Sequence, residues 1–187
     1  MRKLIASVMT SLDGAIEHPE LWSMDYWSDE AEAQACELLF ASDALLLGRV
    51  TYEGFAEAWP EMTDESGYAE RMNSVSKYVV SSTLEKADWN NSTVIGSDVA
   101  GEVAALKQQP GQNILTFGWG RLTESLLSHG LLDEVNVWLH PVLVGSEEGQ
   151  LHRKGVASPL ELVDSRTLAS GIVILNYRPT APKAPED

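Results

Sequence analysis

Two apolar runs that each end in glycine and arginine constrain the fold of this chain most strongly. The first run covers residues 44–49, and the second covers residues 114–121, in which Gly118 and Gly120 precede the arginine. A helical spacing of apolar residues follows each run. In an open α/β sheet, glycine at the carboxyl end of a strand lets backbone N–H groups approach a phosphate, and the N-terminus of the next helix favours its negative charge. The two runs therefore predict two phosphate-binding corners that could hold two ends of one nucleotide.

The rest of the chain alternates between strand patterns and helical patterns. Apolar runs predict strands at residues 4–9, 44–47, 78–82, 93–95, 113–117, 135–144, 160–168 and 172–177. Helical spacing predicts helices at residues 28–39, 49–59, 64–73, 98–107 and 122–129. This alternation requires a doubly wound, mostly parallel mixed α/β sheet with helices on both faces and a C-terminal antiparallel hairpin. We expect a single domain over residues 1–178 and a disordered tail over residues 179–187.

The charge balance limits the classes of partner. The 187-residue chain has 13 Lys+Arg and 28 Asp+Glu, a net charge of -15 that repels nucleic acid and anionic membranes. The single cysteine, Cys36, excludes an intramolecular disulfide, and the four histidines lack metal-ligand spacing, so we expect no metal site. Because no signal-peptide or membrane-spanning pattern is present, we expect a cytoplasmic protein that acts on a small molecule.

Several short segments of this chain resemble one family. Residues 47–53 resemble the Met-Gly-Arg-x-Thr-Tyr/Trp-Glu signature of the dihydrofolate reductase fold, residues 80–82 resemble its next nucleotide-contacting strand end, and residues 117–121 its glycine-rich pyrophosphate turn. Residues 8–14, 130–135 and 140–145 are more similar to the branch related to the reductase domain of riboflavin biosynthesis. The resemblance covers nearly the whole chain, and it implies a dihydrofolate reductase-like fold.

The same resemblance implies an NADPH site. It assigns the adenosine 2′-phosphate and the pyrophosphate to Arg49 and Thr51, and the adenosine phosphate region to the two serines that follow the third strand. The cofactor-binding residues that we expect are Gly48, Arg49, Thr51, Ser81, Ser82, Gly118, Trp119, Gly120, Arg121 and Leu122. A surface salt bridge of Arg49 and simple capping of the strand end by the serines are the alternatives.

Trp119 departs from the family pattern, because the related turns carry a small residue between the two glycines. The indole could cover the cofactor or block the phosphate position. We expect it to fold outward, over the helix that begins at Arg121, because the glycines on both sides are hard to explain unless the turn meets a ligand.

Two aspartates are candidate catalytic residues. Asp13 matches a motif aspartate of the family, although aspartate before glycine also fits a tight turn. Asp29 lies near the start of the helix that carries the substrate-binding acid in dihydrofolate reductases, although N-capping also explains this position. Hydride transfer needs a proton donor only if the reduced atom becomes basic, and a carboxylate or a positioned water can serve.

Two tryptophans indicate the shape of the substrate. Trp22 and Trp138 are expected to bind a planar heterocycle, with burial in the core as the alternative, while the long loop at residues 10–24 excludes water. The predicted function is an NADPH-dependent reductase that transfers hydride to a pterin-like or pyrimidine-like heterocycle, or to a related imine or carbonyl. The alternative is a non-catalytic small-molecule-binding protein on the same fold, in which Trp119 closes the cofactor turn.

We also expect a homodimer. Leu126-Leu127, Leu131-Leu132 and the long strand at residues 135–144 could leave an apolar edge, and related reductase domains often pair there. Pro141 predicts a break or an edge position within that strand.

Overall fold

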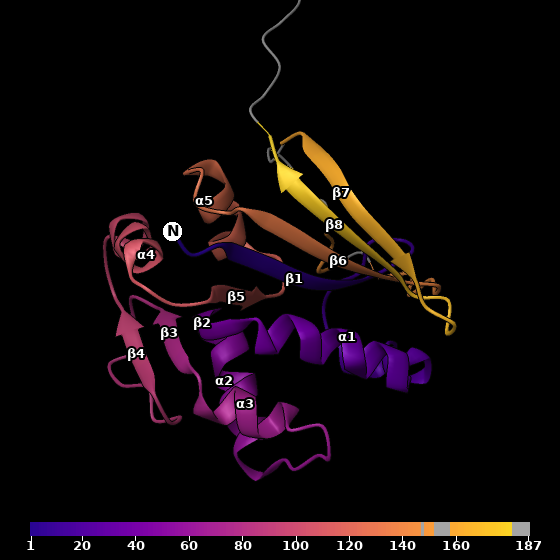
Figure 1. The fold of residues 1–187 in the computed structure, drawn as a ribbon, viewed down its shortest axis with the longest axis horizontal. Coiled ribbons are helices and arrows are strands. Elements are labelled where there is room, and N and C mark those ends of the chain that lie inside the picture. Colours follow the sequence, from indigo (N-terminus) through magenta and orange to yellow (C-terminus); the bar gives the residue numbers. More distant parts are fainter. Residues whose placement is uncertain (147, 152–157, 181–187) are drawn as a thin grey trace, which may run out of the picture.

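The computed structural model describes residues 1–146, 148–151 and 158–180. These residues form one eight-stranded sheet, with α-helices on both faces (Figure 1). The strands are β1 (Leu4–Ser11), β2 (Ser42–Gly48), β3 (Ser76–Val80), β4 (Ser92–Ile95), β5 (Asn113–Phe117), β6 (Glu134–His140), β7 (Leu160–Thr167) and β8 (Val173–Pro179). Their order is β4-β3-β2-β5-β1-β6-β8-β7. All pairs among β1 to β6 are parallel, whereas β8 is antiparallel to β6 and β7, which confirms the predicted fold class.

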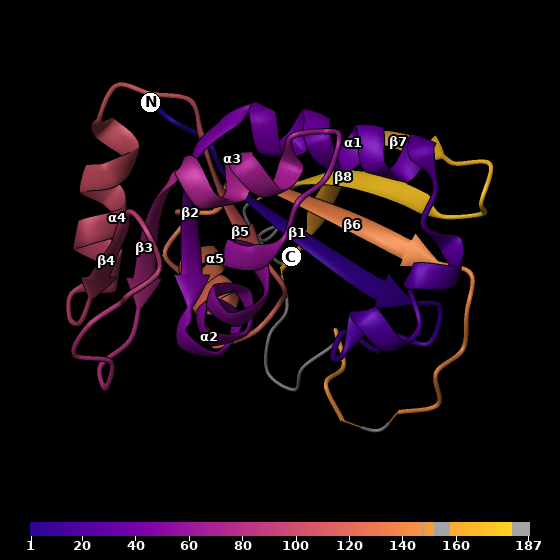
Figure 2. The ribbon, with the colours of Figure 1, turned by 90° about the horizontal axis from the view of Figure 1, so that it is seen from below.

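The helices cover the sheet in two layers. The helices α1 (Asp29–Phe40), α2 (Arg49–Ala58) and α3 (Tyr68–Ser74) lie on one face (Figure 2), and α4 (Val99–Gln108) and α5 (Arg121–Ser128) lie on the other. Side chains of β2 alternate between these layers. Leu45 and Leu47 pack under α1, α2 and α3, and Leu46 packs under α4 and α5. This burial on both faces explains why the strand is apolar throughout.

Several boundaries differ from the sequence prediction. The strand predicted at residues 78–82 covers residues 76–80, and the one predicted at residues 4–9 extends to residue 11. Three further differences have a clear physical cause. The strand predicted at residues 135–144 ends at His140, because Pro141 has no N–H group to continue the ladder. The helix predicted at residues 64–73 begins only at Tyr68, because the Asp64 carboxylate accepts hydrogen bonds from the first two amides of the helix. Pro179 belongs to β8 and Thr180 donates to the Pro159 carbonyl, while residues 181–187 of the predicted tail lie outside the described residues.

The segments expected to form an apolar dimer edge lie inside the fold instead. Leu126 and Leu132 are buried in the core under α4 and α5, and Leu127 and Leu131 pack against the same cluster. The strand β6 lies between β1 and β8 rather than at an edge. That basis for the homodimer was wrong, because residue hydrophobicity alone cannot distinguish a central strand from an edge strand. The hairpin strand β7 is the edge on this side of the sheet.

Three buried cationic side chains lie near the amino ends of the strands. Arg2, just before β1, pairs with Asp43 of β2. The Lys107 ammonium lies 2.5 Å from Asp133, whose carboxylate also accepts a hydrogen bond from the Leu4 amide. In β3, Lys77 is fully buried and donates to three backbone carbonyls at 3.0 Å each. Each of these cations has its partners inside the protein.

No helix within the described residues is long and apolar enough to span a membrane.

Candidate active site

The carboxyl ends of β1 and β5 do not coincide. The pairing of β1 with β5 stops at Ser7 and Phe117, and Gly118 donates to the Ser7 carbonyl at 2.8 Å. The pairing of β1 with β6 continues to Ser11 and His140, so β1 runs on past the end of β5 (Figure 2). After β1 the chain continues to α1 on one face of the sheet, and after β5 it continues to α5 on the other face. Ligands of open α/β sheets bind at such a position.

At this position the backbone N–H and C=O of Met9 have no ladder partner among the described residues. Backbone groups of a strand point alternately to its two neighbours, so those of Met9 point to the same side as the Ser7 carbonyl. The β5 ladder has ended there, and the next amide on that side, Ser11, donates to the Ala15 carbonyl of the following loop. The N–H and C=O of Met9 therefore form an adjacent donor and acceptor that the sheet does not use.

Two helices that begin at this edge lack a capping side chain. Elsewhere, Ser28 caps α1, Asp64 caps α3 and Asp98 caps α4. The helices α2 and α5 instead follow Gly48 and Gly120, which have no side chain to cap them; at α5 the Thr123 hydroxyl accepts from the Gly120 amide, but no side chain accepts from the first three amides of either helix. Such N-termini leave several N–H groups for a ligand or water, and the helix dipole favours an anion there.

The two uncapped corners lie next to each other. The strands β2 and β5 are neighbours, and a Cβ placed on Gly48 would be 4.0 Å from Cδ2 of Leu122 in the first turn of α5. Gly118 has a φ of +80°, which favours glycine, and the space around its Cβ position is open. Gly120 is extended at φ -171°, so its backbone conformation does not require glycine. The predicted corners are thus adjacent, but only Gly118 is demanded by conformation.

The two predicted phosphate-binding arginines differ in their partners. Nη1 of Arg49 lies 3.0 Å from both carboxylate oxygens of Glu53, one helical turn away on α2, and both side chains are about half exposed. This is the surface salt bridge that the sequence left as an alternative. Arg121 is exposed and makes no ion pair with a described residue, although the chain carries a large excess of acids. Thr51 lies in the first turn of α2, beside Arg49.

Ser81 and Ser82 follow the end of β3. The Ser81 hydroxyl is buried and accepts hydrogen bonds from the amides of Thr83 and Leu84 at 3.2 and 3.0 Å. It therefore holds the turn after the strand, which agrees with the capping alternative. Ser82 is exposed next to it, so this serine is the more available of the two for a ligand.

The Trp119 indole is half-buried and packs against the core cluster under α4 and α5. The indole ring therefore lies on the face of the sheet that α5 covers. The hydroxyl of Thr123 bridges the turn, since it accepts from the Gly120 amide and lies within hydrogen-bond distance of the Gly118 carbonyl. The effect of Trp119 on cofactor binding stays a prediction.

Asp13 serves as an anchor between two loops. Its carboxylate accepts hydrogen bonds from the Ser11 hydroxyl at 2.6 Å and from the amides of Val144 and Gly145 at 3.1 and 2.7 Å. These hydrogen bonds, led by that from Ser11, lower the pKa of Asp13 to about 2. The carboxyl group carries no proton at neutral pH. A catalytic role stays a prediction, and the observed contacts indicate positioning of the loop after β6.

Asp29 is the exposed first residue of α1, directly after the capping residue Ser28. Its neighbour Glu30 accepts a hydrogen bond from the Ala169 amide at 2.8 Å and so ties the helix to the turn of the β7-β8 hairpin. No contact of Asp29 itself identifies a role, and its assignment as a catalytic residue stays a prediction.

The sequence analysis missed His140. This residue ends β6, lies opposite Ser11 of β1 and is fully buried. The ring of Trp22 lies 5.3 Å from its ring and that of Tyr26 lies 6.2 Å away, both edge-on. Its Nδ1 lies 3.0 Å from the Trp138 carbonyl, and Nε2 has no hydrogen-bond partner among the described residues. Burial lowers the pKa of His140, so the ring is neutral at pH 7. A histidine before proline at a strand end was the available signal.

The two predicted substrate-binding tryptophans have separate surroundings. Trp22 covers His140, and its Nε1 donates to the Glu17 carbonyl. Trp138 stacks on Trp27, with ring centroids 6.2 Å apart and planes 14° apart, and it donates to Asn136 at 2.5 Å. The structure does not bring the two indoles together.

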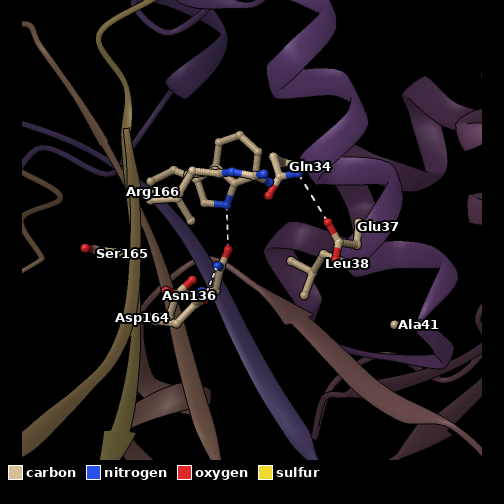
Figure 3. Close-up of a pocket in the computed structure, with 11 residues that line it drawn as sticks. Gln34, Glu37, Leu38, Ala41, Asn136, Asp164, Ser165 and Arg166 are labelled. Atoms are coloured by element: carbon tan, nitrogen blue, oxygen red, sulfur yellow. Dashed lines mark hydrogen bonds between the residues drawn. The ribbon is translucent and has the colours of Figure 1, made fainter. Parts of the chain in front are cut away.

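A cavity of about 560 Å³ lies between α1 and the strands β6, β8 and β7 (Figure 3). Trp138, Asn136 and Asn176 line it from the sheet, and the Asn136 amide donates to the Asn176 side-chain oxygen at 2.6 Å. The α1 residues that line the cavity all lie in the second half of that helix, and the helix leads from there to the amino end of β2. The cavity is therefore separate from the edge where α2 and α5 begin. No group of three potential metal ligands occurs in the described parts of the chain.

Comparison with known proteins places this chain in a family. The model of the RibD C-terminal domain family matches residues 2–174. The chain is 28% identical over 179 residues to the uncharacterized protein YyaP of Bacillus subtilis, and the match covers 94% of each. It is 25% identical over 175 residues to the uncharacterized protein YwjB of the same organism, with 91% and 95% covered.

Solved structures show the same fold. A pyrimidine reductase-like protein from Corynebacterium diphtheriae has a TM-score of 0.64 at 13% identity, with 97% of this chain and 93% of that chain covered. A diaminohydroxyphosphoribosylaminopyrimidine deaminase/5-amino-6-(5-phosphoribosylamino)uracil reductase from Thermotoga maritima has a TM-score of 0.65 at 16% identity, with 96% and 57% covered. With the family match over residues 2–174, the chain belongs to the RibD C-terminal domain family and has its dihydrofolate reductase-like fold.

Proposed function

We propose that this chain is an NADPH-dependent reductase of a small planar heterocycle of the pyrimidine or pterin type. The family is the reductase domain of RibD, which supports an oxidoreductase. One observation carries the proposal: the two helices without capping side chains both begin at adjacent corners of the carboxyl edge. A dinucleotide has several phosphate oxygens that suit two such N-termini at once.

The residues present fit this cofactor. The first turns of α2 and α5 would bind the pyrophosphate through backbone N–H groups, and the free guanidinium of Arg121 would pair with a phosphate oxygen. Arg49 would bind the 2′-phosphate after leaving Glu53, because the present pair is exposed and weak. Ser82 would add a hydroxyl donor near the adenosine.

The unpaired backbone of Met9 suits the other end of the cofactor. A carboxamide offers two N–H donors and one carbonyl acceptor, so one N–H and the carbonyl can match the C=O and N–H of a single strand residue. When bound, the reduced nicotinamide supplies the hydride. The loop that holds Trp22 and Tyr26 is already packed on His140 and would limit the access of water from that side.

A proton must also reach the reduced atom if it becomes basic. Asp13 does not suit this role, because its hydrogen bonds keep it ionised. His140 lies at the same edge, but its ring is fully buried and neutral, and its one N–H is used by Nδ1 toward the Trp138 carbonyl, so Nε2 has no proton to give. We therefore assign proton supply to water.

The experiment titrates the purified chain with NADPH and NADH, follows tryptophan fluorescence, and then assays NADPH oxidation with pterin and aminopyrimidine substrates. We expect NADPH to quench the fluorescence and to bind at least tenfold more tightly than NADH, because only NADPH carries the 2′-phosphate. Absence of binding by either cofactor would contradict the proposal. Binding without turnover would leave the cofactor site intact and reject only the substrate class.

A non-catalytic binding protein is the second candidate. It is favoured by the separate polar cavity near Trp138, and by the fact that Arg49 and Ser81 already have partners within the chain. Trp119→Ser separates the two candidates. A change in NADPH affinity of less than about tenfold fits the reductase, whereas a gain of a hundredfold or more would show that the native turn is blocked.

A further inference from the structure

The cavity between α1 and the hairpin lies apart from the edge where the cofactor would bind. It has a volume of about 560 Å³, and its walls come from α1, β6, β7 and β8 (Figure 3). Sites for small molecules combine apolar walls with a few polar groups that fix the orientation of the ligand. The polar groups of this cavity therefore indicate the chemistry of a ligand that it can bind.

The two asparagines on the sheet side of the cavity offer N–H donors and no free oxygen. The indole of Trp138 can only donate, so the Asn136 atom that lies 2.5 Å from its Nε1 is the side-chain oxygen. That oxygen also accepts from the Ser7 hydroxyl at 3.3 Å. The Asn136 nitrogen then donates to the Asn176 oxygen at 2.6 Å. One N–H of Asn136 and both N–H groups of Asn176 have no acceptor among the described residues.

These donors are held in place by the sheet. Asn136 is only 7% exposed, and its hydrogen bonds join it to Ser7 of β1 on one side and to Asn176 of β8 on the other. A buried donor without an acceptor costs free energy, which a ligand or water can recover. A group that has only acceptor oxygens, such as a carboxylate, matches these donors.

The hairpin adds one cation and one anion to the same cavity. Asp164 and Arg166 line it from β7, and they lie two residues apart on one face of the strand. Neither side chain makes an ion pair with a described residue, although the chain has 28 acidic residues that could pair with an arginine. The cavity therefore holds a guanidinium and a carboxylate that are both available to a ligand.

We propose that this cavity binds a free α-amino acid with an apolar side chain. The ligand carboxylate would accept from the amides of Asn136 and Asn176 and from the guanidinium of Arg166, whose fork matches a carboxylate. The ligand ammonium would pair with Asp164, which lies opposite Asn176 in the β7-β8 ladder. The two charged groups of an α-amino acid share one carbon atom, so they suit partners that lie side by side.

The rest of the cavity suits an apolar side chain. Leu38 lines it from α1, and Trp138 and Ile174, which are 3% and 4% exposed, line it from the sheet. A simple anion or a simple amine would leave one charge of the strand unpaired, and a polar side chain would lose its hydration against these walls. The site lies away from the cofactor edge, so the proposal does not depend on the proposed reductase activity.

Three related ligands test which groups are recognised. L-Phenylalanine carries both charges, 3-phenylpropanoate lacks the ammonium, and 2-phenylethylamine lacks the carboxylate. In isothermal titration calorimetry with the full chain, we expect phenylalanine to bind at least tenfold more tightly than either analogue. No binding of phenylalanine at about 10 mM would overturn the proposal. So would equal affinities for phenylalanine and one analogue, because only one charge would then be recognised.

Substitutions on the hairpin test where the amino acid binds. Asp164→Asn and Arg166→Gln each remove one charge, and we expect each to weaken phenylalanine binding at least tenfold. Arg178→Gln is the matched control, because Arg178 is an exposed arginine of the same hairpin that does not line the cavity. It should leave the affinity unchanged. Equal losses in Arg166→Gln and Arg178→Gln would place the ligand outside the cavity and overturn the proposal.

Asn176→Asp tests the donors on the sheet. The substitution keeps an oxygen that can accept from Asn136 and replaces the free NH₂ group by a second oxygen. We expect it to abolish phenylalanine binding at about 10 mM, because a carboxylate then faces the carboxylate of the ligand. Circular dichroism and thermal unfolding check that each variant is folded. Full affinity in a folded Asn176→Asp variant would overturn the proposal.

Discussion

The two ends of the same parallel strands are built in opposite ways. At the amino ends, Arg2, Lys77 and Lys107 are buried, and each pairs with carboxylates or carbonyls of the protein. At the carboxyl ends, Arg49 and Arg121 are exposed, and two helices begin without capping side chains. The first end uses its charges to hold strands and helices together, and the second leaves donors available. Stability and binding can therefore be altered separately.

Removal of a buried partner at the amino ends should have the largest effect. Lys107→Met leaves the Asp133 carboxylate without its cation, and we expect the free energy of unfolding to fall by about 3 kcal/mol or more. The control is Lys86→Met, because Lys86 and Asp88 form an exposed pair whose loss should change the unfolding free energy far less. Urea denaturation measures both variants. Equal losses would contradict the contrast between buried and exposed charges.

Arg121→Ala tests the other end. We expect the affinity for NADPH to fall roughly tenfold to a hundredfold, because a charge-assisted hydrogen bond contributes about 1.5–3 kcal/mol. The unfolding free energy should change by less than about 0.5 kcal/mol. Arg178→Ala, which removes an exposed arginine of the hairpin near Glu161, serves as the control in the same fluorescence titration. A large loss of stability with unchanged affinity would show that Arg121 belongs to the structural end of this comparison.

The glycine turn separates backbone conformation from ligand approach. Gly118→Ala should destabilise the fold by about 1–2 kcal/mol, because φ of +80° is unfavourable for a residue with a Cβ. Gly120→Ala should be nearly neutral in thermal unfolding, since its backbone is extended. Gly120→Val should weaken NADPH binding by more than tenfold if the phosphate approaches this backbone closely. Unchanged affinity in Gly120→Val would place the phosphate elsewhere.

Arg49 offers a test of cofactor choice. Arg49→Ala should reduce the preference for NADPH over NADH by about tenfold, because the 2′-phosphate loses its guanidinium partner. Glu53→Gln should raise the affinity for NADPH by a few-fold, since it releases Arg49 from the exposed pair. Isothermal titration calorimetry with both cofactors measures these changes. A preference that survives Arg49→Ala would transfer the role to Arg121.

His140 should give the smallest effect, which depends on pH. Burial lowers its pKa in the folded chain, so the unfolded chain binds the proton more readily, and stability falls as pH drops below about 6.5. This contribution is present above that pH. His140→Gln should flatten the slope of the unfolding free energy between pH 7 and about pH 5.5, whereas the exposed His129→Gln should not. Identical slopes in the parent and His140→Gln would indicate that the buried ring keeps an ordinary pKa.

Local patterns were enough to predict the fold and the two glycine corners at the carboxyl edge of the sheet. Continuous apolar runs such as Leu45 to Leu47 indicated strands covered on both faces, and glycine after such runs located the corners at Gly48 and Gly118. Pro141 correctly indicated a break. These features depend on residues close together in the sequence, which hydrophobic periodicity and turn chemistry can report.

Other features depend on contacts between distant residues. Asp13 has its partners at Val144 and Gly145, and nothing near Asp13 in the sequence indicates them. The same holds for the burial of His140 under Trp22, and for the position of β6 inside the sheet. A serine at the end of a strand fitted either ligand binding or capping of the turn. The Ser81 hydroxyl accepts from the amides of Thr83 and Leu84, so it caps the turn. The choice of interior and edge strands is a property of the whole sheet.

The early end of β5 has a consequence for how this protein can evolve. The four residues from Val8 to Ser11 extend β1 by about 13 Å beyond its pairing with β5, and recognition there would use main-chain atoms. A point substitution replaces a side chain and leaves these N–H and C=O groups in place. Changes in the length of β5 would alter them directly. A relative could therefore exchange every side chain along this opening and still bind an amide-bearing ring through the same backbone groups. A short insertion that lengthens β5 would instead use these groups for strand pairing.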